Sequence, residues 1–221
     1  MELRITIPFV ARTYGDRCGI ARALDLVGER WALLVVRELL LGPKRFTDLR
    51  AGLPHVGPDV LAQRLRELQA AGIVRRRRLP PPVPAQVYEL TTRGAALEPV
   101  VLALGRWGSV APVVAPDAGI GPDALAVALK TLFDPGAAAG LDATYELALG
   151  EHLFTVRVAD GRIDVARGGA ERADARLEAA PGTLAQVLWH GRALDEAVRA
   201  GEAGVSGSVG RFLELFPLPA G

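Results

Sequence analysis

The chain is nearly devoid of cysteine and has little histidine. Cys18 is its single cysteine in 221 residues, and its three histidines, His55, His152 and His190, lie far apart in the sequence. One cysteine excludes an internal disulfide framework, and such a scattered set does not match the spacing of a metal-ligand cluster. We therefore expect neither a structural metal nor a cofactor.

Long hydrophobic runs are also missing. Half of the residues are hydrophobic, yet no apolar run reaches the length of about 18 residues that a membrane span needs. Residues 1–10 lack the basic segment and apolar core of a secretory signal peptide. The sequence therefore predicts a cytoplasmic protein without a membrane partner.

Charge is balanced over the whole chain but not within its halves. The formal net charge is +1, whereas residues 1–112 carry 17 Lys and Arg against 10 Asp and Glu, and residues 113–221 carry 9 against 15. A polyanion attracts the first half and repels the second, so the halves are expected to have different partners. Proline and glycine punctuate residues 111–122, and we predict two domains, 1–112 and 122–221, joined by a linker at 113–121.

The basic half predicts a series of short helices. Apolar residues recur at helical spacing between Leu24 and Leu40, and Gly42-Pro43 ends that stretch before the helical segment 46–50. Another helix is expected to open at Pro58, because proline suits the first helical turn. Its leucines at 61, 65 and 68 form an inward stripe.

A basic hairpin is expected after these helices. Residues 73–74 and 87–90 are predicted as strands, and between them lie Arg75–Arg78 and a proline-rich tip at 79–84. Four consecutive arginines repel one another in an apolar interior, so we place them in solvent or against a polyanion, where each neutralised phosphate releases a counterion. Short helices followed by such a hairpin are typical of a winged helix.

A winged helix of this polarity points to DNA. The helix from Pro58 can lie in the major groove with its N-terminal polar side chains at base edges, while its dipole and arginines approach phosphates. A merely solvated hairpin is the alternative for the arginine run. The predicted DNA-contacting residues are Arg45, Thr47, Asp59, Val60, Gln63, Arg64, Arg75, Arg76, Arg77 and Arg78.

Four motifs carry a family resemblance: ALDLVGERW at 23–31, RELLLGPKRFTDL at 37–49, LAQRLREL at 61–68 and YELT at 88–91. They closely resemble the HxlR family of bacterial transcriptional regulators, over residues 12–110. The resemblance implies a homodimer, built from the N-terminal segment and the helix after the wing, that binds a double-stranded operator. That helix is predicted at Arg93–Trp107 with Thr91 or Thr92 as its cap. Its apolar stripe is assigned to the dimer interface, against burial within its own domain: Leu97, Val100, Val101, Leu104 and Trp107.

Cys18 is a candidate redox residue. Several relatives that resemble this sequence sense oxidants or electrophiles through a cysteine at this position. Arg17 and Arg22 favour the thiolate, whereas Asp16 and burial against the helix oppose it. A buried, inert thiol is the alternative.

The acidic half predicts a helix, an antiparallel sheet and trailing helices. We expect helices at 123–133, 181–189, 193–200 and 209–216, and four strands around 145–149, 154–158, 163–165 and 177. Gly150-Glu151 and Asp160-Gly161 are expected to form hairpin turns. The predicted fold class is α+β in two domains.

Segments of this half resemble the sterol-carrier-protein-2-like (SCP2) fold, namely GTLAQVLW at 182–189, DEAV at 195–198, GVSG at 204–207 and FLELF at 212–216. The resemblance implies a pocket for an apolar ligand such as a fatty acid, a lipid or a hydrophobic aromatic compound. Core packing is the alternative for each large side chain that could line it. The residues assigned to the pocket are Phe133, Phe154, Trp189, Phe212 and Phe216.

No motif indicates an enzyme. Gly204, Gly207 and Gly210 lack the spacing and the βαβ context of a dinucleotide loop, and neither His152 nor His190 belongs to a recognisable nucleophile motif. The sequence thus predicts a homodimeric DNA-binding regulator, expected to be a repressor, whose second domain senses an apolar molecule. Two alternatives stay open: a redox regulator acting through Cys18, and a lipid carrier or accessory protein that uses its winged helix for protein contacts.

Overall fold

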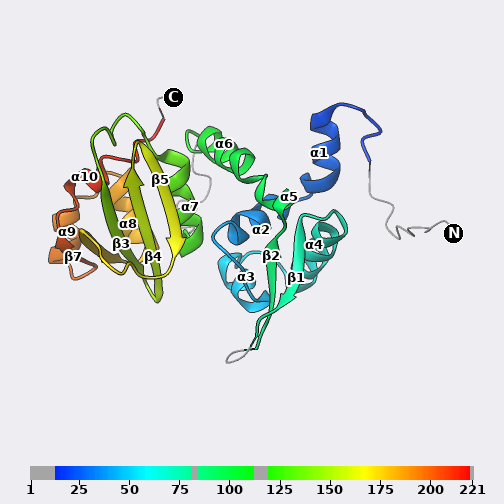
Figure 1. Cartoon of the computed structure of the whole chain (residues 1–221), viewed down its shortest axis with the longest axis horizontal. Helices are drawn as coiled ribbons and strands as arrows, with labels where there is room; N and C mark the ends of the chain where they lie inside the picture. The colour runs from blue at the N-terminus through cyan, green and yellow to red at the C-terminus, as the bar shows by residue number, and fades with distance from the viewer. Residues whose placement is uncertain (1–12, 81–83, 112–118, 220–221) are drawn as a thin grey trace.

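Two bodies of different architecture make up the chain and pack side by side (Figure 1). The computed structural model describes residues 13–80, 84–111 and 119–219. Within these residues, the first body holds six helices around a two-stranded sheet, and the second holds a five-stranded sheet with four helices. Among the described residues, no helix is both long and apolar enough to cross a membrane.

Four helices build the core of the first body: α1 (Gly19–Val27), α2 (Ala32–Leu39), α3 (Phe46–Gly52) and α4 (Pro58–Ala70). The break between α1 and α2 falls at Trp31, whose φ of 78° lies in the left-handed region that non-glycine residues avoid. Helix α4 starts at Pro58 as predicted, and Leu61, Leu65 and Leu68 are buried in the core. The helical part of the winged-helix prediction is confirmed.

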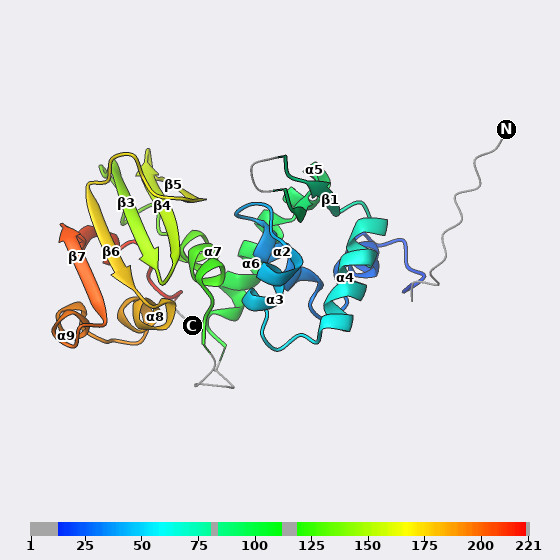
Figure 2. The same cartoon turned by 90° about the horizontal axis from the view of Figure 1, so that it is seen from below.

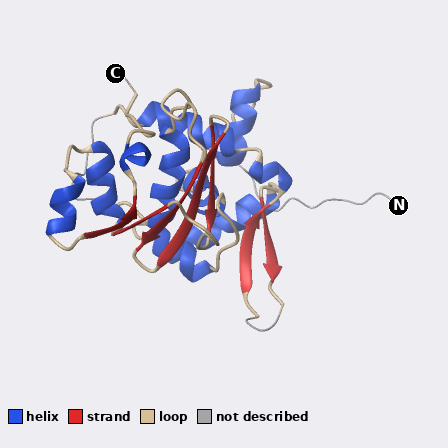
Figure 3. Ribbon diagram, turned by 60° about the vertical axis from the view of Figure 1, so that its left-hand side comes forward, coloured by secondary structure: helices blue, strands red, loops and turns tan. Residues whose placement is uncertain are grey.

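The hairpin consists of β1 (Val74–Arg78) and β2 (Gln86–Leu90), paired antiparallel, and it extends away from the helices (Figure 3). The expectation that Arg75–Arg78 follow the first strand is wrong, because these four residues form most of β1 itself. Side chains alternate across a strand, so the arginines lie on two faces. Residues 81–83 of the predicted tip lie outside the described residues.

The helix predicted at 93–107 is two helices, α5 (Thr92–Ala95) and α6 (Glu98–Gly108). Thr91 caps α5 as expected, since its Oγ1 accepts the amide of Gly94 at 3.1 Å. Pro99 stands in the first turn of α6, where it lacks an N–H to continue a helix from α5. The helix is therefore interrupted between Ala95 and Glu98.

The sheet of the second body is mixed, so the antiparallel prediction needs correction. Its order is β5-β4-β3-β6-β7, and β6 runs parallel to β3 while the other neighbours are antiparallel. The chain leaves β5 at one edge and returns beyond β3, where Asp174 fixes the start of β6 through its bonds with Thr144. The strands are β3 (Ala143–Leu149), β4 (His152–Ala159), β5 (Arg162–Arg167), β6 (Ala175–Ala179) and β7 (Ala203–Gly207).

Strand β7 was not predicted. Its sequence, AGVSG, has two glycines and no alternation of apolar residues, and its side chains are largely exposed at the sheet edge. Gly207 is required there, because its φ is 80° and a Cβ would lie 2.4 Å from the carbonyl oxygen of Asp174. Both predicted hairpin turns are confirmed, since two-residue loops at 150–151 and 160–161 join β3 to β4 and β4 to β5.

Four helices accompany this sheet: α7 (Pro122–Leu132), α8 (Pro181–Trp189), α9 (Leu194–Arg199) and α10 (Gly210–Leu213). Each falls within or beside a predicted helical segment. Helix α7 lies between the two bodies and packs on α2, α3 and α6 as well as on β5 (Figure 2). The second body is therefore docked on the first rather than merely tethered to it. Residues 113–118 of the predicted linker lie outside the described residues.

Candidate DNA-binding surface

Helix α4 presents an exposed N-terminal end. Gly57 precedes it, Pro58 occupies its first turn, and Asp59 and Val60 are exposed as predicted. The N–H groups of a first turn lack partners within the helix, and the macrodipole favours an anion at this end. The buried leucine stripe fixes the opposite side of α4 in the core. This end of α4 can therefore approach a phosphate or a base edge.

Arg64, one of the predicted DNA-contacting residues, is not exposed as that role requires. Its side chain is only 14% exposed, and its guanidinium pairs with Glu67 and lies 3.6 Å from Glu29. Arg64 follows the buried Leu61 by three residues, so it lies beside the inward stripe rather than opposite it. It contributes to the packing of α4 against the α1–α2 turn.

Arg66 lies on the outward side of α4. It is exposed, and its Nη2 donates to Gln63 Oε1 at 2.6 Å. Gln63 is half-buried and donates in turn to Glu67 at 2.7 Å. Positions 59, 63 and 66 share the face opposite the leucine stripe, so helical spacing correctly places Arg66 on the outward side, although Arg66 is not among the predicted DNA-contacting residues.

The wing arginines differ in their partners. Arg75 Nε and Arg77 Nε donate to the two oxygens of Glu89 at 2.7 and 2.8 Å. Arg76, on the other face, stacks on the ring of Tyr88 with 5.8 Å between its Cζ and the ring centroid. Arg78 pairs in register with Gln86 at the outer end of the strand. The Glu89 carboxylate offsets part of the positive charge on one face of the wing.

Arg45 and Thr47 lie at the beginning of α3, and both are exposed, which leaves them accessible to a partner. The backbone amide of Arg45 donates to Asp48 Oδ2 at 3.0 Å, which fixes the first turn of α3. Lys44, the residue before them, is buried. Its backbone forms an antiparallel bridge with Tyr88, so the start of α3 is joined to wing strand β2.

The five residues assigned to the dimer interface fall into two groups, one buried in the domain core and one exposed to solvent. Leu97 and Val101 pack into the core of their own domain, which contradicts their assignment to a partner. Val100, Leu104 and Trp107 form an exposed stripe at helical spacing, and Trp107 is 75% exposed. Helix α1, whose Ile20 and Leu24 are also exposed, stands out from the body (Figure 1).

The residues assigned to an apolar pocket fill the core instead. Phe133, Phe154, Phe212 and Phe216 are buried, and the rings of Phe212 and Phe216 pack edge to face with centroids 5.0 Å apart. Trp189 is half-buried, and its Nε1 donates to the Phe216 carbonyl at 3.1 Å. Core packing therefore overturns this pocket prediction.

A shallow groove of about 500 Å³ lies elsewhere, between α9, β7 and α10. Its lining is largely aliphatic, and none of the five aromatic residues belongs to it. The lining residues are Ala193, Leu194, Asp195, Val198, Val205, Val209, Gly210 and Leu213.

Cys18 is exposed and directly precedes α1. The alternative prediction of a buried, inert thiol is therefore wrong for the monomer. Backbone hydrogen bonds from Ile20 and Ala21 hold the pKa of the Cys18 thiol below its ordinary value. The backbone amide of Cys18 donates to Asp16 Oδ1 at 2.9 Å. The first-turn amides of α1, rather than the neighbouring arginines, are what favours the thiolate.

Comparison with known proteins assigns the first body. A sequence profile described as HxlR-like helix-turn-helix matches residues 26–112. YvaP of Bacillus subtilis, named an uncharacterized HTH-type transcriptional regulator, is 36% identical over 88 residues, which are 40% of this chain and 82% of YvaP. The chain belongs to the HxlR-like helix-turn-helix family.

Two further known proteins are similar to the first body. YodB, an HTH-type transcriptional regulator of Bacillus subtilis, is 38% identical over 85 residues, which are 38% of this chain and 76% of YodB. A solved structure of the redox regulator HypR in its oxidized form is 35% identical, covers 44% of this chain and all of HypR, and has a TM-score of 0.41. The first body of this HxlR-like chain is thus a DNA-binding helix-turn-helix module of the transcription-regulator class.

Proposed function

We propose that the chain is a homodimeric, operator-binding transcriptional regulator, acting as a repressor, that inserts α4 into the major groove and lays its wing on the flanking backbone. One observation carries this proposal: the exposed N-terminal end of α4 and the arginine-rich β1 belong to elements that contact each other. A helix end that favours an anion and a strand of arginines, carried on contacting elements, are the groups that bind base edges and phosphates of duplex DNA. The proposed DNA-binding domain spans residues 1–112, and the second domain spans 122–221.

The test is the salt dependence of binding to a duplex that the protein itself enriches from a random-sequence pool. Replacing Arg76 and Arg78 by alanine should weaken binding to this duplex and to a scrambled one alike, and should flatten the salt dependence by about one unit of slope per lost phosphate contact. Glu151→Gln, at the exposed turn between β3 and β4, is the control. A lipid carrier that uses its winged helix for protein contacts would show no salt-dependent affinity for either duplex.

The dimer part of the proposal rests on exposed apolar side chains. Val100, Leu104 and Trp107 on α6, together with Ile20 and Leu24 on α1, form apolar surface that a monomer leaves in water. A second copy is the proposed occupant, because a two-fold dimer places two α4 helices on one face of the DNA. Sedimentation at micromolar concentration reports the oligomeric state directly.

For the second domain, we propose an SCP2-like fold that binds an apolar small molecule in the α9–β7–α10 groove. The groove's aliphatic lining and its volume suit a small hydrophobic ligand. Calorimetry with fatty acids and hydrophobic aromatic compounds, with and without operator, tests this, since ligand and operator must change each other's affinity by the same factor. Val198→Trp should fill the groove and abolish binding, and an unchanged titration would argue against this site.

A second candidate function is sensing of oxidants or electrophiles through Cys18, which the exposure and lowered pKa of the thiol favour. The thiolate is the reactive form of cysteine, and this one lies at the start of α1, next to the proposed dimer surface. Cys18→Ser should abolish any effect of diamide or a quinone on operator affinity. An unchanged response in that variant would exclude this function.

A further inference from the structure

We propose that Lys44 is a positioning residue for the DNA-binding surface, and that Asp123 of the second domain holds it in place. The proposal rests on the DNA binding proposed above and adds that the second domain sets operator affinity without any ligand. Lys44 belongs to the basic motif that opens α3, where a lysine is ordinarily expected to bind phosphate. Its surroundings in this structure assign it a different role.

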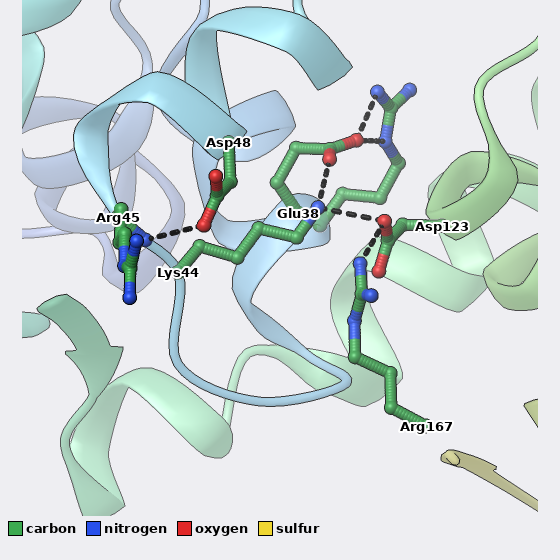
Figure 4. Close-up of polar contacts among 7 residues, drawn as sticks. Glu38, Lys44, Arg45, Asp48, Asp123 and Arg167 are labelled. Carbon is green, nitrogen blue, oxygen red and sulfur yellow. Dashed lines mark hydrogen bonds and ion pairs between the residues drawn. The ribbon is translucent and has the colours of Figure 1, made fainter. Parts of the chain in front are cut away.

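The ammonium group of Lys44 is buried between two carboxylates (Figure 4). The side chain is 5% exposed, and its Nζ donates to Glu38 Oε2 at 2.5 Å and to Asp123 Oδ2 at 2.7 Å. Glu38 comes from α2, whereas Asp123 comes from the first turn of α7. The ammonium therefore links the two bodies and cannot reach a phosphate outside.

Charged neighbours complete the cluster around these carboxylates. Arg37 Nη2 binds Glu38 Oε1 at 2.8 Å, and Arg167 of β5 binds Asp123 Oδ2. Asp123 Oδ1 is buried and has no hydrogen-bond partner among the described residues. Among the described residues, the side chains that hold the Asp123 carboxylate, Lys44 and Arg167, thus both donate to Oδ2. Removing one charge would leave a buried countercharge uncompensated, which is strongly unfavourable.

The backbone of Lys44 transmits this anchoring to the wing. Its amide donates to the Tyr88 carbonyl at 3.0 Å, and the Tyr88 amide donates back to the Lys44 carbonyl at 2.8 Å. Tyr88 also carries Arg76 stacked on its ring, and Arg45, next to Lys44, begins α3. One residue therefore joins α7 of the second domain to both the wing and the helix-turn-helix.

Close packing around the cluster leaves little freedom for another arrangement. A Cβ on Gly52 would lie 2.1 Å from Glu38 Oε2, so a larger residue at the end of α3 would displace the carboxylate that Arg37 and Lys44 hold. Gly121, which precedes α7, lies close to Gly52: a Cβ on Gly121 would be 3.9 Å from the Gly52 carbonyl oxygen. Helix α7 also contacts both α2 and α3. The position of α7 is thereby fixed against the helices that carry the DNA-binding surface.

The test compares Lys44→Gln and Asp123→Asn in the full-length protein, on the duplex enriched from a random pool. Both variants should lower operator affinity by about tenfold, within the usual range of coupling between sites. Neither should change the slope of affinity against salt, because neither residue contacts phosphate. The double variant should lose no more than the single ones, since both act through one contact.

Asp164→Asn is the matched control, because it makes the same charge change at an exposed position on β5 of the same domain. Hydrogen exchange supplies a second readout: the amides of Lys44 and Tyr88 should exchange faster in Asp123→Asn than in Asp164→Asn, while amides of β3 and β4 stay protected. This readout remains informative if Lys44→Gln fails to fold, because Asp123→Asn replaces a carboxylate by an amide of the same shape.

Two results would overturn the proposal. A Lys44→Gln variant whose salt slope falls by about one would place Lys44 on a phosphate. An Asp123→Asn variant that matches Asp164→Asn in affinity and in hydrogen exchange would show that the second domain does not position the surface. If the wild type itself lacks salt-dependent binding, the proposed function fails instead, and the exchange measurement still reports on the Lys44 contact.

Discussion

At the scale of single residues, burial separates two arginines that look alike in the sequence. Arg64 and Arg66 lie two positions apart on α4, yet Arg64 is held by Glu67 and Glu29 while Arg66 is exposed. We predict that Arg66→Ala weakens operator binding by roughly 1–3 kcal/mol, concentrated at one base pair if the guanidinium reads a base. Arg64→Ala should instead lower the free energy of unfolding by roughly 1 kcal/mol.

Gel-shift titrations on single-base variants of the operator, with thermal unfolding of both proteins, distinguish these effects. The two variants serve as controls for each other, because both remove an arginine from the same helix. Loss of base-specific affinity in Arg64→Ala but not in Arg66→Ala would show that the ion pairs open on DNA and that Arg64 is the reading residue.

The Cys18 thiol gives a prediction that depends on pH. The amides of Ile20 and Ala21 stabilise the thiolate, which lowers the thiol pKa. The rate of alkylation by iodoacetamide should therefore reach half its maximum below pH of about 8.5, the ordinary pKa of cysteine. The same chain unfolded in urea is the reference, since Cys18 is its single thiol and α1 is then absent. A midpoint in the folded protein at or above that of the unfolded chain would contradict the role of these amides.

At the scale of elements, sequence patterns predicted most helices but not how their faces are used. The leucine stripe of α4 and the two-residue turns at 150–151 and 160–161 are local signals, and the structure confirms them. The parallel pairing of β3 with β6 depends on a crossover that no local pattern encodes. Strand β7 forms because Gly204 and Gly207 fit an edge beside β6, although their sequence favours a loop.

Helix α6 shows why the site was only partly predictable. Its apolar residues were treated as one stripe, but Leu97 and Val101 face their own core. Glu98 and Gly105 face α7, where Glu98 pairs with Lys130 and Gly105 approaches Thr131. One side of this segment thus packs on its own core and another side packs on α7. The periodicity of the α6 sequence does not indicate which side contacts which neighbour. The exposed Val100, Leu104 and Trp107 are what remains for a partner.

Leu104→Asp tests this remaining stripe. A charge at the centre of an apolar interface is left without a partner, so the variant should be monomeric at micromolar concentration and lose specific operator binding. Leu153→Asp is the control, because Leu153 is similarly exposed, at 39% against 48% for Leu104, but lies on β4 of the second domain. Sedimentation velocity measures both. A Leu104→Asp protein that sediments like the wild type would remove α6 from the interface.

At the scale of the whole molecule, the two bodies meet along α6 and α7 as well as at the Lys44 cluster. Arg106 of α6 donates from Nε and Nη2 to the carbonyls of Thr131 and Phe133, each at 3.3 Å, and so satisfies the C-terminal end of α7. A Pro/Gly-rich sequence at 111–122 suggests independent domains, but these contacts link them. Such contacts lie between residues far apart in the sequence, and composition could not predict them.

This contact predicts that the two bodies unfold together in the wild type. A Cβ on Gly105 would lie 3.0 Å from Thr131 Cγ2, closer than ordinary contact, so Gly105→Val should force α6 and α7 apart at a cost of about 1–3 kcal/mol. Calorimetry should then show two transitions in the variant where the wild type shows one. Adding Thr131→Ala removes the obstructing methyl and hydroxyl groups, and the double variant should regain a single transition. Two transitions already present in the wild type, or no recovery in the double variant, would mean that the α6–α7 contact does not couple the bodies.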